Sequence, residues 1–219
     1  MLSQTEENYL KAIFSISQHS AKSVSTNNIA EKLNTKASSV TDMIKKLSEK
    51  GLIDYKKYKG SSLTEKGKKR AIKIVRKHRL WEVFLVEKLN FNWGEVHDLA
   101  EQLEHIESDE LTERLDKFLN HPTKDPHGDP IPDADGNIRS KDSILLSNCE
   151  RNTFYNVASV KDNSSEFLQY LEKHSINIDT KLKVLEKFDF DDSITIQINH
   201  NKNLTVSKKV CSNVYVNII

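Results

Sequence analysis

The sequence predicts a mainly α-helical fold with a small β domain, and three observations carry this prediction. Apolar residues recur at helical spacing through most of the chain up to residue 120. All four prolines lie between Pro122 and Pro132, where they exclude regular structure. Beyond residue 150 the pattern changes to short β-rich runs separated by turn signals. A chain of 219 residues is long enough for one large domain or two smaller ones.

The first 50 residues predict three helices. Residues 4–19 place apolar side chains on one helical face. Residues 27–33 form a short second helix, for which Ser25 or Thr26 can serve as the N-cap. After the turn NTKA, residues 38–50 again carry an apolar stripe. Two short helices joined by a tight turn predict a helix-turn-helix.

A hairpin follows directly. Gly51 ends the third helix, and residues 52–64 give two β-like runs around a Lys-Gly turn. A helix-turn-helix followed at once by such a hairpin predicts a winged helix-turn-helix. From Glu65 a helical pattern resumes to residue 89, and Gly67 near its start costs about 1 kcal/mol.

The stretch HDLAEQLEHIESDE carries the most informative polar pattern. Two histidines and two glutamates occur at offsets of 0, 4, 7 and 8: His97, Glu101, Glu104 and His105. At about 100° per residue they fall within roughly one quadrant of a helix. The apolar residues fall on the other side: Val96, Leu99, Leu103 and Ile106. Carboxylates with imidazoles suit manganese, iron or zinc, although such a face is more often simply solvated.

A second pair lies upstream, where His78 and Glu82 are spaced i, i+4 on one helical face. Alone, this pair is weaker evidence for a metal than the downstream set. Residues 108–120 predict one more helix, and residues 133–142 predict a loop or linker.

The last part of the chain predicts a small SH3-like β-barrel. Five short runs are β-rich: TFYNVASV, KLKVLEKF, SITIQIN, NLTVS and NVYVNI. One helix, SSEFLQYLEKH, lies among them. Several short strands around one helix are typical of such a barrel.

The formal net charge of +1 conceals a division of charge. Residues 1–79 contain 18 Lys and Arg against 7 Asp and Glu, whereas the remainder contains 15 against 25. A basic N-terminal third on an acidic remainder favours a module that binds a polyanion such as nucleic acid. The alternative is a surface that is merely rich in lysine.

Composition narrows the class of protein. With 30% charged and 37% hydrophobic residues, the chain fits a soluble globular protein. No apolar run approaches the roughly 20 residues of a membrane span, and the acidic N-terminus predicts no secretion signal. Cys149 and Cys211 lie far apart and read as reduced thiols. We therefore expect a cytoplasmic protein with no membrane partner.

The motif order resembles a known family. A winged helix is followed by RKHRLWEVFL, VHDLAEQLEHIESDEL, the loop PHGDPIP and a small β domain. Over essentially the whole chain this resembles the metal-dependent repressors typified by the diphtheria toxin repressor and the manganese-transport repressors. The resemblance implies three domains: a winged helix-turn-helix DNA-binding domain (1–72), a helical metal-binding and dimerisation domain (73–140) and an SH3-like, iron-transport-protein-A-like domain (141–219).

The resemblance also implies two metal sites in each protomer. Glu101, Glu104 and His105 match the primary site, together with the N-terminal position that Asn8 occupies here. The ancillary site of iron-type members corresponds to His78, Glu82 and His97. Further candidate ligands come from a loop and the β domain: Asp125, His127, Asp162 and Glu166.

The metal preference implied is Mn(II) first and Fe(II) second. Glu101 stands where iron-type repressors have cysteine, and Asp125 replaces a cysteine of streptococcal manganese regulators. Oxygen and imidazole ligands favour hard Mn(II) over softer ions. Two positions depart from relatives: Asn8 replaces methionine or aspartate, and Lys11 stands where one manganese-type relative has glutamate.

We expect the protein to bind double-stranded operator DNA as a homodimer. The recognition helix and its start should contact bases and phosphates through Lys36, Ser38, Ser39, Thr41, Asp42 and Lys45. The wing should contact phosphates through Lys56, Lys57, Tyr58 and Lys59. The helices after residue 80 are the expected dimer surface.

Three functions compete at this stage. A metal-activated repressor predicts DNA binding that depends on metal and salt. A metalloenzyme would use the same acids and histidines around an open coordination position, but nothing in the basic third suggests a substrate pocket. A metal-independent winged-helix regulator that senses a small molecule predicts DNA binding unchanged by a chelator. The metal-activated repressor, which is not an enzyme, fits the sequence best.

Overall fold

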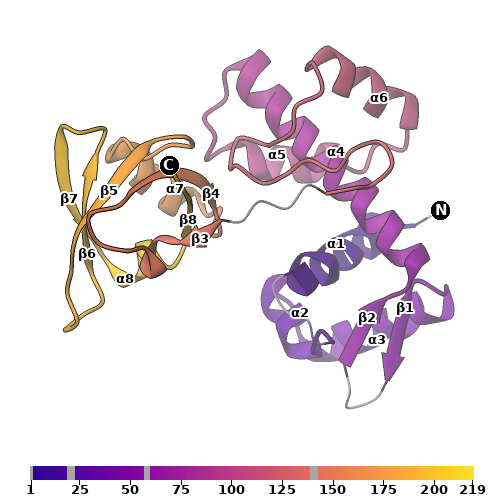
Figure 1. The fold of residues 1–219 in the computed structure, drawn as a ribbon. Helices are drawn as coiled ribbons and strands as arrows, with labels where there is room; N and C mark the ends of the chain where they lie inside the picture. Colours follow the sequence, from indigo (N-terminus) through magenta and orange to yellow (C-terminus); the bar gives the residue numbers. More distant parts are fainter. Residues whose placement is uncertain (1, 19–22, 57–59, 139–142) are drawn as a thin grey trace. The chain divides into compact units, whose positions relative to one another are not determined.

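A computed structural model of the protein describes residues 2–18, 23–56, 60–138 and 143–219. Figure 1 shows the order of the helices and strands along the chain. The chain divides into two compact units. The first contains Met1–His78, Glu101–Arg114 and Pro132–Asn137, and the second contains Arg79–Ala100, Leu115–Ile131 and Ile138–Ile219.

The N-terminal part confirms the predicted winged helix-turn-helix. Its elements are α1 (Gln4–Gln18), α2 (Thr26–Lys32), α3 (Ala37–Glu49), β1 (Ile53–Lys56) and β2 (Gly60–Leu63). Ser25 is the N-cap of α2, because its side chain accepts a hydrogen bond from the Asn28 backbone N–H. β1 and β2 pair antiparallel, with Ile53 opposite Leu63. The wing residues Lys57, Tyr58 and Lys59 lie outside the described residues.

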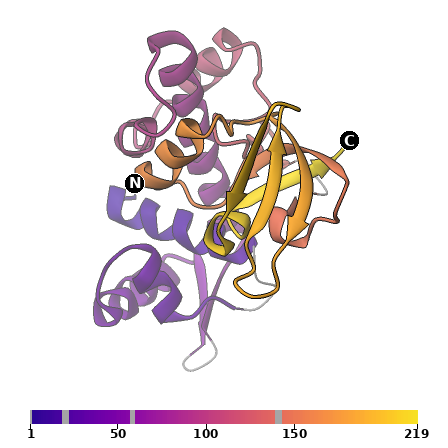
Figure 2. The same cartoon turned by 90° about the vertical axis from the view of Figure 1, so that its left-hand side faces the viewer.

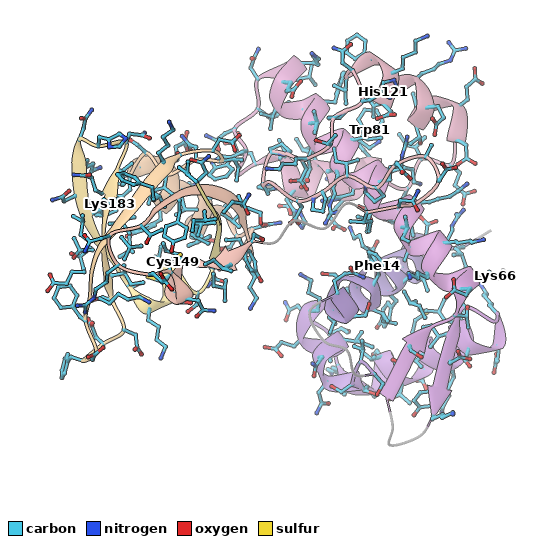
Figure 3. All side chains as sticks on the ribbon, viewed as in Figure 1. Phe14, Lys66, Trp81, His121, Cys149 and Lys183 are labelled. Carbon is cyan, nitrogen blue, oxygen red and sulfur yellow. The ribbon has the colours of Figure 1, made fainter. Side chains whose placement is uncertain are left out.

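An apolar core holds these helices together. Leu10 and Ile13 of α1 are fully buried, as are Ile29 of α2 and Ile44 of α3. Phe14, labelled in Figure 3, adds an aromatic ring to the same buried face of α1. The apolar spacing read from the sequence therefore corresponds to real burial in the first three helices.

Helix α4 (Glu65–Leu89) passes close to the backbone that leads into the wing. At Gly67 an added Cβ would lie 2.0 Å from the Leu52 carbonyl oxygen. Glycine is therefore required there by close packing, and its cost in helix propensity is secondary. At the other end of α4, Leu80 and Val83 pack with Leu115 in the core of the second unit. Trp81, labelled in Figure 3, packs edge-on against Phe84 beside that core.

Helix α5 (Val96–Leu103) is shorter than the pattern predicted, so Glu104 and His105 lie in the turn after it. The apolar and polar sides predicted for this helix also differ from its buried and exposed sides. The buried positions are Val96, Ala100 and Glu104, whereas Ile106 is 41% exposed. These three buried residues are spaced i, i+4, i+8, so Glu104 continues the buried side of the helix.

Helix α6 (Asp109–Phe118) precedes the proline-containing loop. The loop contains no helix, as predicted, and a short bridge pairs Lys124 with Pro130. The Asp125 side chain organises it, because Oδ1 accepts hydrogen bonds from the backbone N–H groups of His127 and Asp129, both at 2.9 Å.

The C-terminal region is the predicted SH3-like domain. Its six-stranded sheet has the order β3-β8-β4-β5-β6-β7; several of its strands are seen side by side in Figure 2. The strands are β3 (Ile144–Leu145), β4 (Phe154–Val160), β5 (Lys181–Lys187), β6 (Ile194–Ile198), β7 (Lys202–Val206) and β8 (Val214–Ile218). The helices are η1 (Leu146–Asn148), α7 (Ser165–Lys173) and α8 (Lys208–Cys211); the sequence did not predict η1, α8 or β3.

Both cysteines belong to the core of this domain. Cys149, labelled in Figure 3, and Cys211 are free and buried. Burial raises the pKa of each thiol to about 11. Within the described part of the chain, no helix has the length and apolarity needed to cross a bilayer.

Candidate metal centre

Helix α1 carries charged and amide side chains on the side next to its apolar face. At about 100° per residue, Glu7, Asn8 and Lys11 fall within about 100° of one another around the helix. Glu6 and Glu7 are only 1% and 2% exposed. A buried carboxylate needs a cation or hydrogen-bond donors, so this face must meet other polar residues of the first unit.

Glu6 joins α1 to the end of the recognition helix α3. Its Oε1 lies 2.6 Å from the Lys50 ammonium and 3.1 Å from that of Lys46. Hydrogen bonding by Lys50, followed by that of the Ser3 backbone N–H and Lys46, holds the Glu6 pKa at about 2 despite burial. The ion pairs therefore fix the first turn of α1 against α3.

Residues predicted for the primary site lie beside α1 with Glu7, Lys11 and the predicted ancillary ligand His78. We call this group the α1 cluster: Glu7, Asn8, Lys11, His78, Glu101, Glu104 and His105. The Lys11 ammonium contacts Glu101 and also lies 2.7 Å from Glu104 Oε2. His78 Nδ1 lies 2.6 Å from the same Glu104 oxygen. Glu104 is fully buried, so these two nitrogens are its immediate electrostatic environment.

Glu7 orients His105 within the α1 cluster. Its Oε2 accepts a hydrogen bond of 2.8 Å from His105 Nδ1, and its Oε1 accepts one of 2.7 Å from Arg70. Because the proton is on Nδ1, the Nε2 lone pair of His105 is available; it lies 3.9 Å from Glu104 Oε1. Hydrogen bonding of the second ring nitrogen to a carboxylate is the usual arrangement of a metal-binding histidine.

Two oxygens of the α1 cluster have no hydrogen-bond partner among the described residues. They are Asn8 Oδ1 and Glu104 Oε1, and both are buried. A buried oxygen without a donor is unfavourable, and a metal ion is one kind of partner that could satisfy such an oxygen. The donor set of carboxylate, amide oxygen and imidazole therefore fits a hard divalent metal.

A second group, the loop cluster, joins α4, α5 and the proline-containing loop in the second unit: Glu82, His97, Asp125 and His127. Glu82, Asp125 and His127 are all buried and offer ligand atoms within 4.8 Å of one another. Glu82 Oε1 lies 3.6 Å from His127 Nδ1 and 3.5 Å from His97 Nδ1. Two carboxylates and an imidazole in this space could hold one metal ion.

The loop around His127 fixes which ring nitrogen faces Glu82. His127 Nε2 lies 2.9 Å from the Trp93 carbonyl oxygen, and the Trp93 and His127 rings stack at 5.9 Å. The carbonyl can only accept, so Nε2 carries the proton and Nδ1 is the atom available to a metal. Gly128 allows this loop to approach β4, since an added Cβ would lie 2.1 Å from the Ala158 carbonyl oxygen.

Two groups of the loop cluster, Asp125 and His127, have raised pKa values. Burial, and then the negative charge of Glu82, raise the pKa of Asp125 to about 7. Burial lowers the pKa of His127, but hydrogen bonding and charge from Glu82 outweigh it and raise the value to about 9. Arg79 Nε lies 3.3 Å from Asp125 Oδ2 and offsets part of the negative charge.

The two candidate ligands from the β domain lie near the start of α7. Asp162 is half-buried, and its Oδ1 accepts a hydrogen bond of 2.9 Å from the Ser164 backbone N–H. Glu166 is exposed in the first turn of α7. The start of this helix is tied to the α4–α5 connection, because the Ser165 hydroxyl donates to the Gly94 carbonyl at 2.9 Å.

The predicted DNA-contacting side chains are mostly exposed. Those in solvent are Lys36, Ser38, Ser39, Asp42, Lys45 and Lys56. Thr41 is half-buried, and its hydroxyl donates to the Ala37 carbonyl at 3.0 Å. The hydroxyl is thus already engaged within α3, while the lysines and serines remain available.

Sequence reasoning missed Glu6 and Glu7 as members of this arrangement, and noted Lys11 only as a departure from relatives. The signal available was an acidic first turn with a lysine four residues later, which is common on solvated helices. The loop residues Asp125 and His127 were found through the resemblance alone.

Each of the three parts of the chain matches a known family of protein domains. Residues 1–61 match the iron dependent repressor N-terminal DNA binding domain. Residues 64–133 match the iron dependent repressor metal binding and dimerisation domain, and residues 144–218 match the FeoA domain. These matches cover the winged helix, the helices that carry both clusters, and the SH3-like domain; the domain boundaries at residues 72 and 140 stay a prediction.

Curated relatives match the N-terminal part. The iron-dependent repressor IdeR of Mycobacterium tuberculosis is 37% identical over 131 residues, which are 60% of this chain and 56% of IdeR. The diphtheria toxin repressor of Corynebacterium diphtheriae is 31% identical over 134 residues, 61% of this chain and 59% of that protein. The matches thus span little more than half the length of these relatives.

Solved structures match the whole chain. A manganese-dependent transcriptional repressor in complex with manganese is 35% identical, with a TM-score of 0.91 over 98% of this chain and 100% of that one. The manganese regulator SloR is 37% identical, with a TM-score of 0.81 over 98% of each chain. With its three domain matches and this full-length similarity, the chain belongs to the family of metal-dependent transcriptional repressors.

Proposed function

We propose that this protein represses transcription in the cytoplasm by binding double-stranded operator DNA as a homodimer when it is loaded with Mn(II). The observation that carries this proposal is the α1 cluster. It brings hard oxygen and imidazole donors together in the same compact unit as the winged helix. Two of its buried oxygens, Asn8 Oδ1 and Glu104 Oε1, have no hydrogen-bond partner among the described residues.

Two metal sites per protomer are part of the proposal. In the α1 cluster the ligands are Asn8, Glu101, Glu104 and His105. In the loop cluster they are Glu82, His97, Asp125 and His127, with Asp162, Glu166 and the ancillary-type His78 as further candidates. A bound divalent ion would neutralise carboxylates that otherwise repel one another.

The chain's own residues give a route from the α1 cluster to the recognition helix. Glu7 forms a hydrogen bond with His105, and the adjacent Glu6 pairs with Lys46 of α3 and with Lys50, the C-cap of that helix. A shift of the first turns of α1 would therefore move the end of α3. On this basis, a metal that orders α1 favours one placement of the DNA-reading helix.

Mn(II) is the first choice of metal and Fe(II) the alternative. Neither cluster contains a thiolate, because both cysteines lie in the core of the SH3-like domain. Glu101 and Asp125 supply carboxylate oxygens instead, which favour a hard ion. Similar proteins include both manganese-dependent and iron-dependent repressors, so the ranking of the two ions must be measured.

Dimerisation is proposed to use the helices after residue 80. In the second unit Leu89 and Phe118 are 52% and 60% exposed. Phe118 lies next to Phe84, with ring centroids 6.2 Å apart, and under the Lys88 ammonium. Large exposed apolar side chains of this kind are typical of a surface that meets a partner.

One titration tests the proposal. Duplexes are first selected from a random pool by the Mn(II)-loaded protein, and their binding is then followed by fluorescence anisotropy against Mn(II), Fe(II), Zn(II) and a chelator. We expect Mn(II) to tighten binding at least tenfold, and Glu104→Gln to abolish this gain. Glu107→Gln, a change at an exposed acid of the same unit, is the matched control.

Two results would count against the proposal. Binding that a chelator leaves unchanged would favour the metal-independent winged-helix regulator. A Glu104→Gln variant that keeps the full response to Mn(II) would remove the α1 cluster from the mechanism.

A further inference from the structure

The Lys11 side chain occupies the space between the two carboxylates of the α1 cluster. Its ammonium contacts Glu101 and lies 2.7 Å from Glu104 Oε2, residues that are 90 and 93 positions away in the sequence. The Lys11 side chain is 17% exposed, and the Glu104 side chain is fully buried. This is not an exposed surface pair of the kind that contributes little.

Charge explains why a cation is needed at this position. Two carboxylates brought together repel each other, and Glu104 cannot rely on water because it is buried. The Lys11 ammonium supplies the compensating charge, while His78 Nδ1 supplies a hydrogen bond to the same Oε2 atom. The folded metal-free chain therefore has a stable arrangement for both carboxylates.

The Lys11 ammonium does not give every oxygen of the α1 cluster a hydrogen bond. Asn8 Oδ1 and Glu104 Oε1 remain without a hydrogen-bond partner among the described residues. Lys11 offers only N–H donors on one flexible chain, so it cannot act as a ligand itself. A divalent ion could bind these oxygens together with His105 Nε2, but only after the ammonium has left the two carboxylates.

We propose that Lys11 is an internal counter-ion of the metal-free protein, and that Mn(II) binds the α1 cluster by displacing its ammonium. The proposal rests on the function proposed above, since it concerns the same site. Displacement makes metal binding weaker than the ligands alone would allow. Lys11 thereby sets the concentration of metal at which the protein responds.

The test measures Mn(II) binding to the full chain without DNA, using the electron paramagnetic resonance signal of free Mn(II). Lys11→Met keeps the length of the side chain and removes its charge. We expect one Mn(II) site to bind about tenfold more tightly, and the melting temperature of the metal-free protein to fall. Lys11→Arg keeps a cation and should bind Mn(II) no more tightly than the parent.

Matched controls separate this effect from a general change of charge. Lys73→Met removes a lysine of the same unit that is 59% exposed and pairs with Asp109, and it should leave Mn(II) affinity unchanged. In a Glu104→Gln background, Lys11→Met should give a smaller gain in affinity than in the parent, because only Glu101 of the two carboxylates still holds the ammonium.

Unchanged or weaker Mn(II) binding by Lys11→Met would overturn the inference. If the metal-free variant does not fold, saturating Mn(II) must restore the parent's circular-dichroism spectrum, and failure of that rescue would also overturn it. This test contains no DNA. If operator binding by the parent protein did not depend on Mn(II), that result would therefore refute only the proposed function.

Discussion

Glu7 gives a sharp test of how the chain would prepare the metal site proposed for the α1 cluster. The carboxylate accepts the Nδ1 proton of His105 at 2.8 Å, which leaves Nε2 available for a metal. Removing such a partner from a metal-binding histidine typically costs 10- to 100-fold in affinity, about 1.4 to 2.7 kcal/mol. In Glu7→Gln the amide oxygen can still accept the proton, so we expect the lower limit, about tenfold. Glu7→Ala should approach about 100-fold.

The assay is a titration of the full chain with Mn(II), and isothermal titration calorimetry measures the affinity. The matched control is Glu107→Gln, because Glu107 accepts a hydrogen bond of 2.7 Å from the same Arg70. Both variants replace a carboxylate partner of Arg70 with a neutral amide, but only Glu7→Gln alters the contact with His105. Equal Mn(II) affinities for the two variants would refute the reasoning, and circular dichroism must show both folded.

Four further outcomes are expected. Glu6→Gln should lower the free energy of unfolding by about 1–2 kcal/mol at neutral pH. Because the folded pKa of Glu6 is about 2, below its ordinary 4.5, this contribution should disappear as urea denaturation is repeated from pH 4.5 down to pH 2. Metal affinity of the loop cluster should rise with pH between 6 and 9 in calorimetry, since Asp125 (pKa about 7) and His127 (about 9) must lose protons; a flat profile would contradict their role. Gly67→Ala should destabilise the protein by at least about 2 kcal/mol in thermal melts, despite better helix propensity, because its Cβ would overlap the Leu52 carbonyl. Lys45→Ala should flatten the slope of log K against log salt by about 0.9 if Lys45 contacts a phosphate, and an unchanged slope would exclude that contact.

The order of elements was readable from the sequence because it depends on local patterns. Apolar residues at helical spacing predicted α1 and α3, and Ser25 and Gly51 marked where helices begin and end. The change to short β-rich runs predicted the C-terminal domain. Short elements with weak apolar patterns, such as β3 and α8, escaped because two to four residues carry too little periodicity.

The residue types of the candidate metal ligands were also readable, since Glu101, Glu104 and His105 lie within one turn and a half of chain. The environment of these three residues could not be read from the sequence. The sequence predicted that these residues share one polar face, but it gave no sign that Glu104 is fully buried beneath Lys11 and His78. Periodicity reports which residues share a face, and it does not report which distant segment covers that face.

Local spacing thus determined the winged helix-turn-helix, the helices that follow and the His and Glu candidate ligands of those helices, whereas Asn8, Asp125 and His127 came from the resemblance alone. Only the tertiary structure decided what those ligands meet: Lys11 and Glu7 of α1 reach the turn after α5, and Asp125 and His127 reach Glu82 of α4. These partners are separated by about 40 to 100 residues, and short-range periodicity carries no information at that separation. Burial then sets the charge each group can hold, because a carboxylate removed from water needs a cation, whether lysine or metal, at contact distance.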